Sequence, residues 1–400
     1  MHLTHLSLTN FRSFARLDME IPRRVVLLTG NNAQGKTSIL EAVYFLAAFT
    51  SFQTHTDRHL VNFVEAKKEL AVGRLTAEYV RGTAKHRLEI RLVIEGVGVN
   101  GQRMRKEVLL DGVKRPMAEV IGCFNAVIFV PQMVQIIEGG PEERRRYLNL
   151  ALAQTVPGFA RSLSEYGDAL SQRNALLKQL GERGGDQTQL DFWDETLTRA
   201  GAAILIHRIE ALQEIEKLAA RIHRDLTHGT DVLRVHYLPA YDPLPAPEGQ
   251  MALRMTTPVQ RTGIGEDEIR QGFAAALKGA RAEEINRGVT TLGPHRDDLR
   301  FLVGGIDLGD YGSRGQIRTA LLALKLAEIE WMKSKTGQCP VLLLDEVLAE
   351  LDIQHRADLL AYLENTDQAL LTTTDLHLFP PGFCDKAKVW EVGSGKVKEV

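Results

Sequence analysis

One stretch of the sequence, GNNAQGKTS, has the residue types and the spacing of a phosphate-binding loop. It sets the pattern Gly-x-x-x-x-Gly-Lys-Thr between an apolar run, 25–29, and a predicted helix, 36–48. The glycines allow backbone N–H groups to curl around a phosphate, and the helix N-terminus adds a partial positive charge. Lys36 would bring a charge to the β- and γ-phosphates, and the Thr37 hydroxyl could bind Mg²⁺. An empty glycine turn is the alternative, but the flanking strand and helix favour a phosphate site.

A second stretch, PVLLLDEVLAELD, supplies the acids that such a loop needs. Four apolar residues, 341–344, predict a buried strand that ends at Asp345 and Glu346. One carboxylate at the end of a strand can support Mg²⁺, and its neighbour can orient or deprotonate an attacking water. A buried strand with a solvated end is the alternative for this stretch taken alone.

A third stretch, YGSRGQIRT, predicts a helix that begins at Ser313. The serine can act as N-cap, and apolar residues further along the helix would bind it to a core. The N–H groups and hydroxyl at this helix start form a second anion site, although the loop at 30–37 already provides a complete one. A second anion site predicts a second copy of the chain; a capped helix with nothing bound is the alternative.

Composition limits the class of protein. The chain has 400 residues, 44% of them apolar, which is enough for two or more domains. Because 49 basic residues face 51 acidic ones, for a net charge of -2, any nucleic-acid contact must come from a local basic surface. Cys123, Cys339 and Cys384 lack metal-ligand spacing and suit a reducing interior. Without a signal sequence or a run near the roughly 18 apolar residues of a membrane span, we expect a cytoplasmic protein.

Hydrophobic periodicity predicts strands and helices in an α/β order at both ends of the chain. Alternation over 71–94 indicates antiparallel strands with one wet face, followed by a turn at 95–102 and a hairpin through Asp111-Gly112. The other expected strands are 5–8, 25–29, 126–132, 299–303, 341–344 and 369–373, with a closing hairpin at 389–400. The expected helices of the C-terminal part are 316–331 and 354–363.

The middle of the chain is predicted to be helical. An apolar seam with 3-4 spacing runs over 190–222, and the glycines at 181–186 form the bend of a helical hairpin before it. A proline-rich loop at 237–249 and a helix at 266–286 follow. The long seam fits a buried core helix or a coiled-coil arm.

Together, these motifs resemble the RecF family of recombination-mediator ATPases, which is related to the SMC proteins. The resemblance is carried by NFRSF, by PEERRRYL after FVPQ, by GPHRDDL, and by SRGQIRTALLALKLAE, where transporters have LSGGQ. It implies an α/β fold: an ABC-type (SMC-like) P-loop ATPase head with mixed β-sheets around a central helix, plus an inserted, mainly α-helical lobe. The expected head comprises 1–135, with the P-loop and an antiparallel β-subdomain, and 296–400, with the signature, the acid pair and the D-loop. The expected lobe is 136–295.

The resemblance also implies roles for individual residues. Nucleotide binding falls to Gly30, Asn31, Asn32, Ala33, Gln34, Gly35, Lys36, Thr37 and Ser38, with Lys36 also catalytic. Arg12 would lie near the α-phosphate or the base, and Glu346 would be the catalytic base. Mg²⁺ would be held by Thr37, Asp345 and Gln132, and Gln132 would also sense the attacking water.

Further residues are implied at the seam between two copies. Those that would reach the partner's nucleotide or line the seam are Ser313, Gly315, Gln316 and Asp352. Thr374 stands where transporters have a switch histidine; it can hydrogen-bond a phosphate without carrying charge, which predicts slow hydrolysis. His377 is the alternative for this position.

The implied function is that of an ATP- and Mg²⁺-dependent switch. The resemblance predicts a homodimer in the ATP-bound state and weak, DNA-stimulated hydrolysis of ATP. It also predicts binding of double-stranded DNA and of single-strand/double-strand junctions at gaps and stalled forks. RecR and RecO would be partners in loading RecA, on the nucleoid in the cytoplasm. An ATPase subunit of an ABC transporter and a small-molecule P-loop kinase are the alternatives.

The DNA surface is predicted from basic residues. The first candidates are Arg144, Arg145 and Arg146, for which a solvated helix start is the alternative. The second set lies on the hairpins: Arg103, Arg105, Lys106, Lys114 and Arg115. The acids and bases of GPHRDD form either a salt-bridged turn or a link between lobe and head.

Overall fold

The chain folds into two compact units. The computed structural model describes residues 1–54, 56–96, 102–244, 259–261, 263–393 and 395–399. The first unit, here called the head unit, combines 1–133 with 328–400; the second, the inserted unit, is 134–327. The predicted domain boundaries, 135/136 and 295/296, differ from this division because they assign 296–327 to the head. The predicted domains stay a prediction.

The head unit contains a mainly parallel sheet that positions the phosphate loop. Its strand order is β15-β14-β3-β13-β12-β8, and every pair is parallel except β14–β15. The strands are β3 (Val25–Thr29), β8 (Ala126–Phe129), β12 (Val341–Asp345), β13 (Ala369–Thr372), β14 (Lys388–Gly393) and β15 (Lys396–Glu399). Parallel strands are covered on both faces, which explains the short apolar runs. Because their carboxyl ends meet at one edge, the phosphate loop and the acid pair share that edge.

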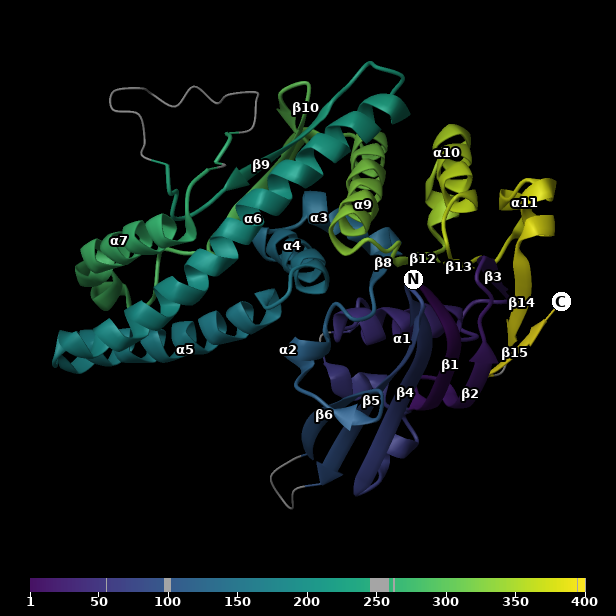
Figure 1. Ribbon diagram of the computed structural model, residues 1–400, viewed down its shortest axis with the longest axis horizontal. Coiled ribbons are helices and arrows are strands. Elements are labelled where there is room, and N and C mark those ends of the chain that lie inside the picture. Colours follow the sequence, from purple (N-terminus) through teal and green to yellow (C-terminus); the bar gives the residue numbers. More distant parts are fainter. Residues whose placement is uncertain (55, 97–101, 245–258, 262, 394, 400) are drawn as a thin grey trace. The chain divides into compact units, whose positions relative to one another are not determined.

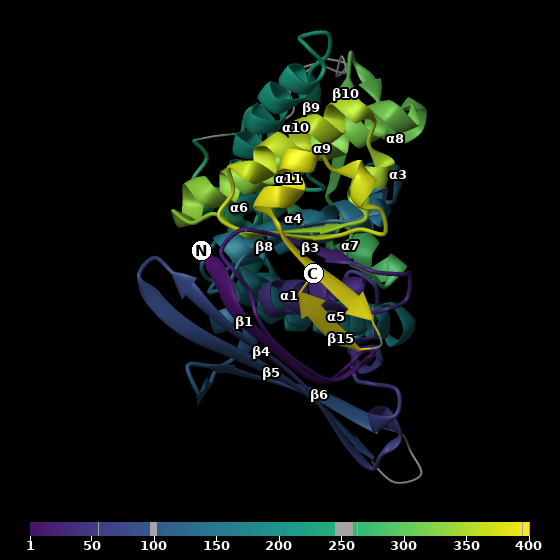
Figure 2. The same ribbon diagram turned by 90° about the vertical axis from the view of Figure 1, so that its right-hand side faces the viewer.

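A second, antiparallel sheet of the head unit has the order β2-β1-β4-β5-β6-β7. Its strands are β1 (His2–Phe11), β2 (Phe14–Glu20), β4 (Leu70–Arg81), β5 (Ala84–Gly96), β6 (Gln102–Leu110) and β7 (Val113–Lys114). Helix α1 (Lys36–Ala48) contacts strands of both sheets and lies between them (Figures 1 and 2). Nearly every side chain of α1 from Ile39 onward is therefore buried. The mixed sheets around a central helix are confirmed.

Several strand predictions need correction. The first strand is longer than the predicted 5–8, and β2 was not predicted. The predicted strand 126–132 ends at Phe129, because Pro131, which has no N–H to donate, begins a short 3-10 helix. The Asp111-Gly112 turn is confirmed, with positive φ at both residues. The turn predicted at 95–102 falls mostly outside the described residues.

The inserted unit packs helices around a small antiparallel sheet of order β11-β10-β9. Its helices and strands are α3 (Gln135–Glu138), α4 (Pro141–Thr155), α5 (Phe159–Arg183), α6 (Leu190–Leu226), β9 (Leu233–Leu238), α7 (Glu266–Arg287), β10 (Asp298–Val303), β11 (Ile306–Asp307) and α8 (Leu308–Tyr311). Helices α5 and α6 form the predicted hairpin, and α6 packs against α5, α7 and β9. The apolar seam of α6 is therefore buried, as in a core helix. Strand β9 was not predicted, and the proline-rich loop is described only to residue 244.

The remaining elements are one long helix that belongs to both units and several short helices. Helix α9 (Arg314–Thr336) begins in the inserted unit and ends in the head unit. The other helices are α2 (Met117–Val120), α10 (Ile353–Glu364) and α11 (Pro381–Lys386). The 3-10 helices are η1 (Asp57–Leu60), η2 (Glu65–Lys67), η4 (Pro131–Val134), η5 (Gln187–Gln189), η6 (Val347–Glu350) and η7 (Leu376–Leu378). None of the helices in the described ranges combines the length and the apolar character that crossing a bilayer requires.

Candidate nucleotide site

The phosphate loop between β3 and α1 depends on glycine at two positions. Gly30 has φ +134°, and a Cβ added there would lie 2.4 Å from the carbonyl oxygen of Val392 on β14. Gly35 has φ +103°, and its Cβ would lie 2.9 Å from the Phe14 ring and 3.0 Å from Ser13 Oγ. The NFRSF turn therefore packs directly on the loop. Only glycine satisfies both the backbone conformation and the close approach.

Lys36 and Thr37 project from the start of α1 toward the acid pair. The Lys36 side chain is 4% exposed, and Nζ donates to the carbonyls of Gly30 (2.7 Å) and Asn31 (3.0 Å). Its ammonium also lies 3.7 Å from Glu346 Oε1. The Lys36 ammonium therefore lies at the mouth of the phosphate loop, where phosphate oxygens could replace the two carbonyls as its partners.

The two carboxylates at the end of β12 point in different directions. Thr37 Oγ1 donates to Asp345 Oδ1 (2.8 Å), so the first acid contacts the helix start. The Glu346 side chain is 42% exposed and lies near Lys36. Glu346 adopts φ +52°, a left-handed conformation that costs an L residue roughly 1–2 kcal/mol. The two acids therefore contact different groups at the start of α1: Asp345 the Thr37 hydroxyl, and Glu346 the Lys36 ammonium.

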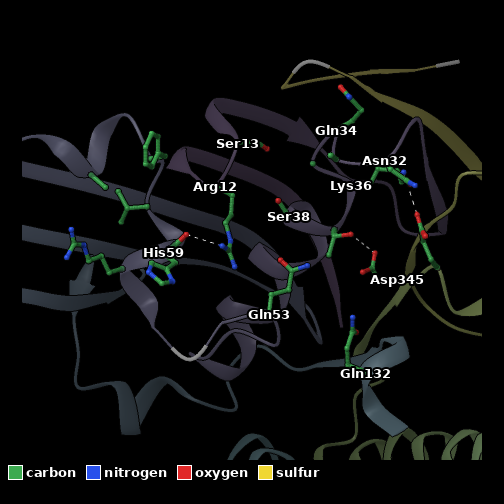
Figure 3. Close-up of a pocket in the computed structure, with 18 of the residues that line it drawn as sticks. Arg12, Ser13, Asn32, Gln34, Lys36, Ser38, Gln53, His59, Gln132 and Asp345 are labelled. Atoms are coloured by element: carbon green, nitrogen blue, oxygen red, sulfur yellow. Dashed lines mark hydrogen bonds and ion pairs between the residues drawn. The ribbon is translucent and has the colours of Figure 1, made fainter. Parts of the chain in front are cut away.

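A cavity of about 1070 Å³ opens in the head unit beside these groups. Figure 3 shows Lys36 and Asp345 on one side of it, Arg12, Gln53 and His59 on the other, and Gln132 pointing into it. The residues predicted for nucleotide binding that line it are Arg12, Asn32, Ala33, Gln34, Gly35, Lys36, Thr37, Ser38, Gln132, Asp345 and Glu346. The cavity therefore brings together residues from the start, the middle and the end of the head unit's sequence.

One wall of the cavity comes from a segment that gave no sequence signal. Its lining residues include Gln53, Arg58, His59, Val61, Phe63, Ala66 and Lys67. The Phe63 side chain is 73% exposed, with the Lys67 ammonium 4.1 Å from its ring centre. This segment has no motif in the sequence that predicts a binding site. It lines the cavity because it packs on the antiparallel sheet.

Arg12 lines the cavity, and its guanidinium is fixed by hydrogen bonds to a buried acid. Its guanidinium donates to both carboxylate oxygens of Glu41, at 2.7 and 2.6 Å, and to the carbonyl of His59 at 3.0 Å. Glu41 lies on α1, is fully buried and also accepts from Ser51. This network joins β1, α1 and the wall segment. The predicted contact of Arg12 with the α-phosphate or base stays a prediction.

The residues predicted for the seam between two copies are not among those lining this cavity. Ser313 is the N-cap of α9, but its Oγ accepts from the N–H of Gln316 (3.2 Å), and the Gln316 side chain accepts from the N–H of Ser313 (3.0 Å). The two hydrogen bonds form a capping box, so Ser313 is an N-cap as predicted, and its proposed contact with a nucleotide stays a prediction. Asp352 caps α10 through His355 N–H, a hydrogen bond that lowers the pKa of the Asp352 carboxyl. Thr374 lies exposed after β13.

Two of the three predicted DNA-binding arginines of α4, Arg144 and Arg145, have partners inside the inserted unit. Arg144 pairs with Asp298 (2.7 Å) and donates to the carbonyl of Gly139 (2.5 Å). Arg145 donates to the carbonyl of Asp297 (2.7 Å), and burial lowers its pKa; Arg146 is half-buried. These contacts are not those of a solvated helix start, and DNA contact by the run stays a prediction.

The second predicted basic set lies on β6 and β7. Lys106 pairs with Asp57 (2.7 Å), Arg105 with Glu95 and Glu107, and Lys114 with Glu107. The side chain of Arg103 is exposed. Acidic neighbours therefore offset much of the positive charge of this strand.

The groups at the loop mouth fit a magnesium-bound triphosphate. A hydroxyl and a carboxylate, Thr37 and Asp345, meet at 2.8 Å beside the phosphate loop. Mg²⁺ prefers such oxygen ligands and is usually completed by phosphate oxygens and water. No group of three acidic, histidine or cysteine side chains suited to a metal occurs in the described ranges. A divalent cation here would therefore depend on the nucleotide for most of its ligands.

The fold and this loop define the class of protein: an ABC-type, SMC-like P-loop ATPase head with an inserted helical lobe. Comparison with solved structures agrees, because the SMC head domain of Pyrococcus furiosus, bound to the C-terminal domain of ScpA, matches with a TM-score of 0.51. That match covers all of this chain and 96% of the other at 15% identity, so it shows the fold alone.

More similar proteins narrow the assignment. The model of the RecF/RecN/SMC N terminal domain matches residues 2–381. DNA replication and repair protein RecF of Roseiflexus castenholzii is 38% identical over 407 residues, covering 99% of each chain. RecF of Lacticaseibacillus paracasei is 35% identical, again over 99% of each chain. A structure of the recombination mediator protein RecF with ATP, in the RecFOR pathway, matches with a TM-score of 0.82, at 29% identity over 100% of this chain and 97% of the other. The chain belongs to the RecF family, as its motifs predicted.

Proposed function

We propose that this protein is a RecF-type DNA repair ATPase in which bound ATP acts as a switch. The observation that carries the proposal is the convergence of the phosphate loop, Lys36, the Thr37–Asp345 pair and Glu346 on one cavity. Similarity to RecF structures that contain ATP supports the choice of nucleotide. RecF membership also disfavours the transporter and small-molecule kinase alternatives.

The residues of the cavity divide the work of binding and hydrolysis. The Lys36 ammonium exchanges the two loop carbonyls for β- and γ-phosphate oxygens, and the loop N–H groups face the phosphates. Thr37 and Asp345 would hold Mg²⁺, which would offset phosphate charge, and Gln132 lines the same cavity. Glu346, whose carboxylate lies 3.7 Å from the Lys36 ammonium, orients or deprotonates the attacking water. Thr374, a neutral switch residue, favours slow turnover.

ATP binding promotes a homodimer in this proposal. Ser313, Gly315, Gln316 and Asp352 reach the nucleotide of the other copy, so that ATP stabilises the dimer by the free energy of these contacts. Two large apolar side chains beside them are exposed: Tyr311 at 80% and Ile353 at 83%. Side chains of this kind are common at protein–protein interfaces.

The dimer binds double-stranded DNA and single-strand/double-strand junctions at gaps and stalled forks. With RecR and RecO, it would help to load RecA on the nucleoid in the cytoplasm; similarity to a structure from the RecFOR pathway supports this. DNA would stimulate the weak hydrolysis that returns the dimer to monomers. Arg103 is the first residue of the predicted DNA set to test, because its side chain is exposed. Loss of one phosphate contact should lower the slope of log binding constant against log salt concentration by ~0.9.

Sedimentation of a Glu346→Gln variant tests the switch. This variant should bind ATP with Mg²⁺, hydrolyse it slowly and accumulate as a dimer, whereas Lys36→Ala should stay monomeric. Gapped DNA should raise the ATP turnover of the wild-type protein. Unchanged sedimentation of Glu346→Gln at saturating ATP would contradict the proposed dimer, and absence of ATP binding by the wild-type protein would contradict the site itself.

A further inference from the structure

A single buried threonine connects the two acids of the nucleotide site. Thr372 is the last residue of β13, and the parallel register sets it beside Asp345 on β12. Its side chain is almost fully buried, at 4% exposed. Thr372 Oγ1 donates to Asp345 Oδ1 (2.7 Å) and accepts from the N–H of Glu346 (3.0 Å). One hydroxyl therefore contacts both residues proposed to act on nucleotide and water.

The direction of these two hydrogen bonds is fixed by chemistry. A hydroxyl has one proton to give, and the backbone N–H of Glu346 can only donate. The Thr372 proton must therefore point at Asp345 Oδ1, which accepts it. Thr37 donates to the same oxygen at 2.8 Å, so two hydroxyls use the two lone pairs of Oδ1. Any further partner of the Asp345 carboxylate must then bind Oδ2.

The second bond acts on the backbone of Glu346. That residue has φ +52°, which L residues adopt only where the surroundings favour it. The N–H bond to Thr372 fixes the peptide at the start of this strained turn. The turn directs the Glu346 carboxylate toward Lys36, 3.7 Å away, while Asp345 faces Thr37.

We propose that Thr372 is a positioning residue for ATP hydrolysis, which holds the Asp345 carboxylate and the Glu346 backbone in one fixed arrangement. The inference rests on the proposed function. Thr372 would not touch the nucleotide; it acts through the two acids, as partners behind a metal ligand commonly do. Its loss would let Asp345 rotate and the Glu346 turn relax, so that the cation and the attacking water are no longer held in the productive geometry.

The neighbouring threonine provides a matched control. Thr373 is equally buried, at 3% exposed, and its hydroxyl also makes two hydrogen bonds: it donates to the carbonyl of Asp375 and accepts from Asp375 N–H. Neither bond involves the acid pair. Valine at position 372 or 373 removes one hydroxyl with two bonds in each case, whereas Thr372→Ser keeps the hydroxyl and removes only the methyl group.

The test measures steady-state ATP hydrolysis, Mg²⁺ dependence of binding and thermal stability for these three variants. For Thr372→Val, we expect a kcat about 10- to 100-fold lower, with the KM for ATP within about threefold of wild type. The Mg²⁺ concentration for half-maximal binding of a fluorescent ATP analogue should rise about tenfold. Thr372→Ser should stay within about threefold of wild type in both, and Thr373→Val should lose thermal stability without either change.

The outcomes separate the inference from the proposed function. Equal behaviour of Thr372→Val and Thr373→Val overturns the positioning role, as does a Thr372→Ser variant that folds but is as impaired as expected for valine. If Thr372→Val does not fold, the serine variant still decides, because a role of the methyl group alone predicts that serine fails. Wild-type protein that neither binds nor hydrolyses ATP overturns the proposed function and the inference with it.

Discussion

Replacing Asp297 with asparagine would remove one negative charge from the interior of the inserted unit. Asp297 belongs to the GPHRDDL motif, and its side chain is 2% exposed, like that of its partner Arg208. Its carboxylate accepts from Arg208 Nη1 (2.6 Å), from the Tyr237 hydroxyl and from the N–H of Ala240 (2.9 Å). Arg208 also donates to the carbonyl of Pro294 (2.7 Å). The motif thus joins α6, β9 and β10 through one carboxylate.

The magnitude follows from what asparagine cannot do. It keeps the shape of aspartate but replaces an accepting oxygen with an NH₂ group, so at least one of the three donors faces another donor. Arg208 would also stay buried without its counter-charge. Breaking a buried pair in this way costs about 3–5 kcal/mol, a large part of the 5–15 kcal/mol that typically stabilises a domain. For a unit of this size, the melting temperature should fall by roughly 10–15 °C.

Differential scanning calorimetry and urea denaturation followed by circular dichroism would measure the loss. Glu182→Gln is the matched surface control, because the Lys178–Glu182 pair is 3.9 Å apart and its side chains are 72% and 58% exposed. That control should cost no more than ~0.5 kcal/mol. Nucleotide binding by folded Asp297→Asn protein should be unchanged, since every residue lining the nucleotide cavity lies in the head unit.

The reasoning would be refuted by an Asp297→Asn variant that loses less than about 1 kcal/mol, close to the surface control. If such a stable variant were instead defective in DNA binding, the GPHRDDL motif would be a contact surface and not the centre of a polar core in the inserted unit.

Two further predictions concern the loop and the same core. Gly30→Ala should weaken ATP binding at least about tenfold, because its Cβ would lie 2.4 Å from the Val392 carbonyl at φ +134°; Gly82→Ala, where φ is +62° but the space is open, should bind normally, and equal titrations for the two would contradict the steric argument. Burial lowers the pKa of His295 to about 4, while its Nδ1 accepts from the Tyr166 hydroxyl. As pH falls below about 6.5, His295 is protonated in the unfolded chain but stays neutral in the folded chain. The free energy of unfolding should therefore fall by about 3 kcal/mol by pH ~4. In urea titrations, His295→Asn should not show this loss of stability between pH ~6.5 and ~4. The same pH dependence in wild type and variant would contradict the role of His295.

The sequence was informative wherever chemistry depends on neighbours along the chain. The phosphate loop, the helix after it and the acid pair at 345–346 all follow from local spacing, and the structure places them at one cavity. The N-cap at Ser313 was also predictable, although its hydroxyl turned out to be engaged by Gln316. The family and the α/β class followed from several such motifs occurring in order.

Contacts between distant segments were decided by the tertiary structure. The wall at 53–67 reaches the cavity by packing on the antiparallel sheet, and Arg12 is fixed by Glu41, 29 residues away in sequence. Arg144 was predicted from its run of arginines, yet it pairs with Asp298, 154 residues away. A run of arginines in the sequence does not show whether acidic side chains from a distant segment will pair with it in the folded protein.

Thr372 shows most clearly which features the sequence determines and which depend on the tertiary structure. Three consecutive threonines, 372–374, are alike in the sequence, and the switch position drew attention to the last of them. Strand pairing alone sets the first against Asp345, buries the second against its own turn and leaves the third exposed. Local spacing determines what a residue can do chemically. The register of a sheet and the packing of its faces decide which partner the residue meets, because both depend on segments that are not neighbours in the sequence, such as the strands of Asp345 and Thr372, which are 27 residues apart.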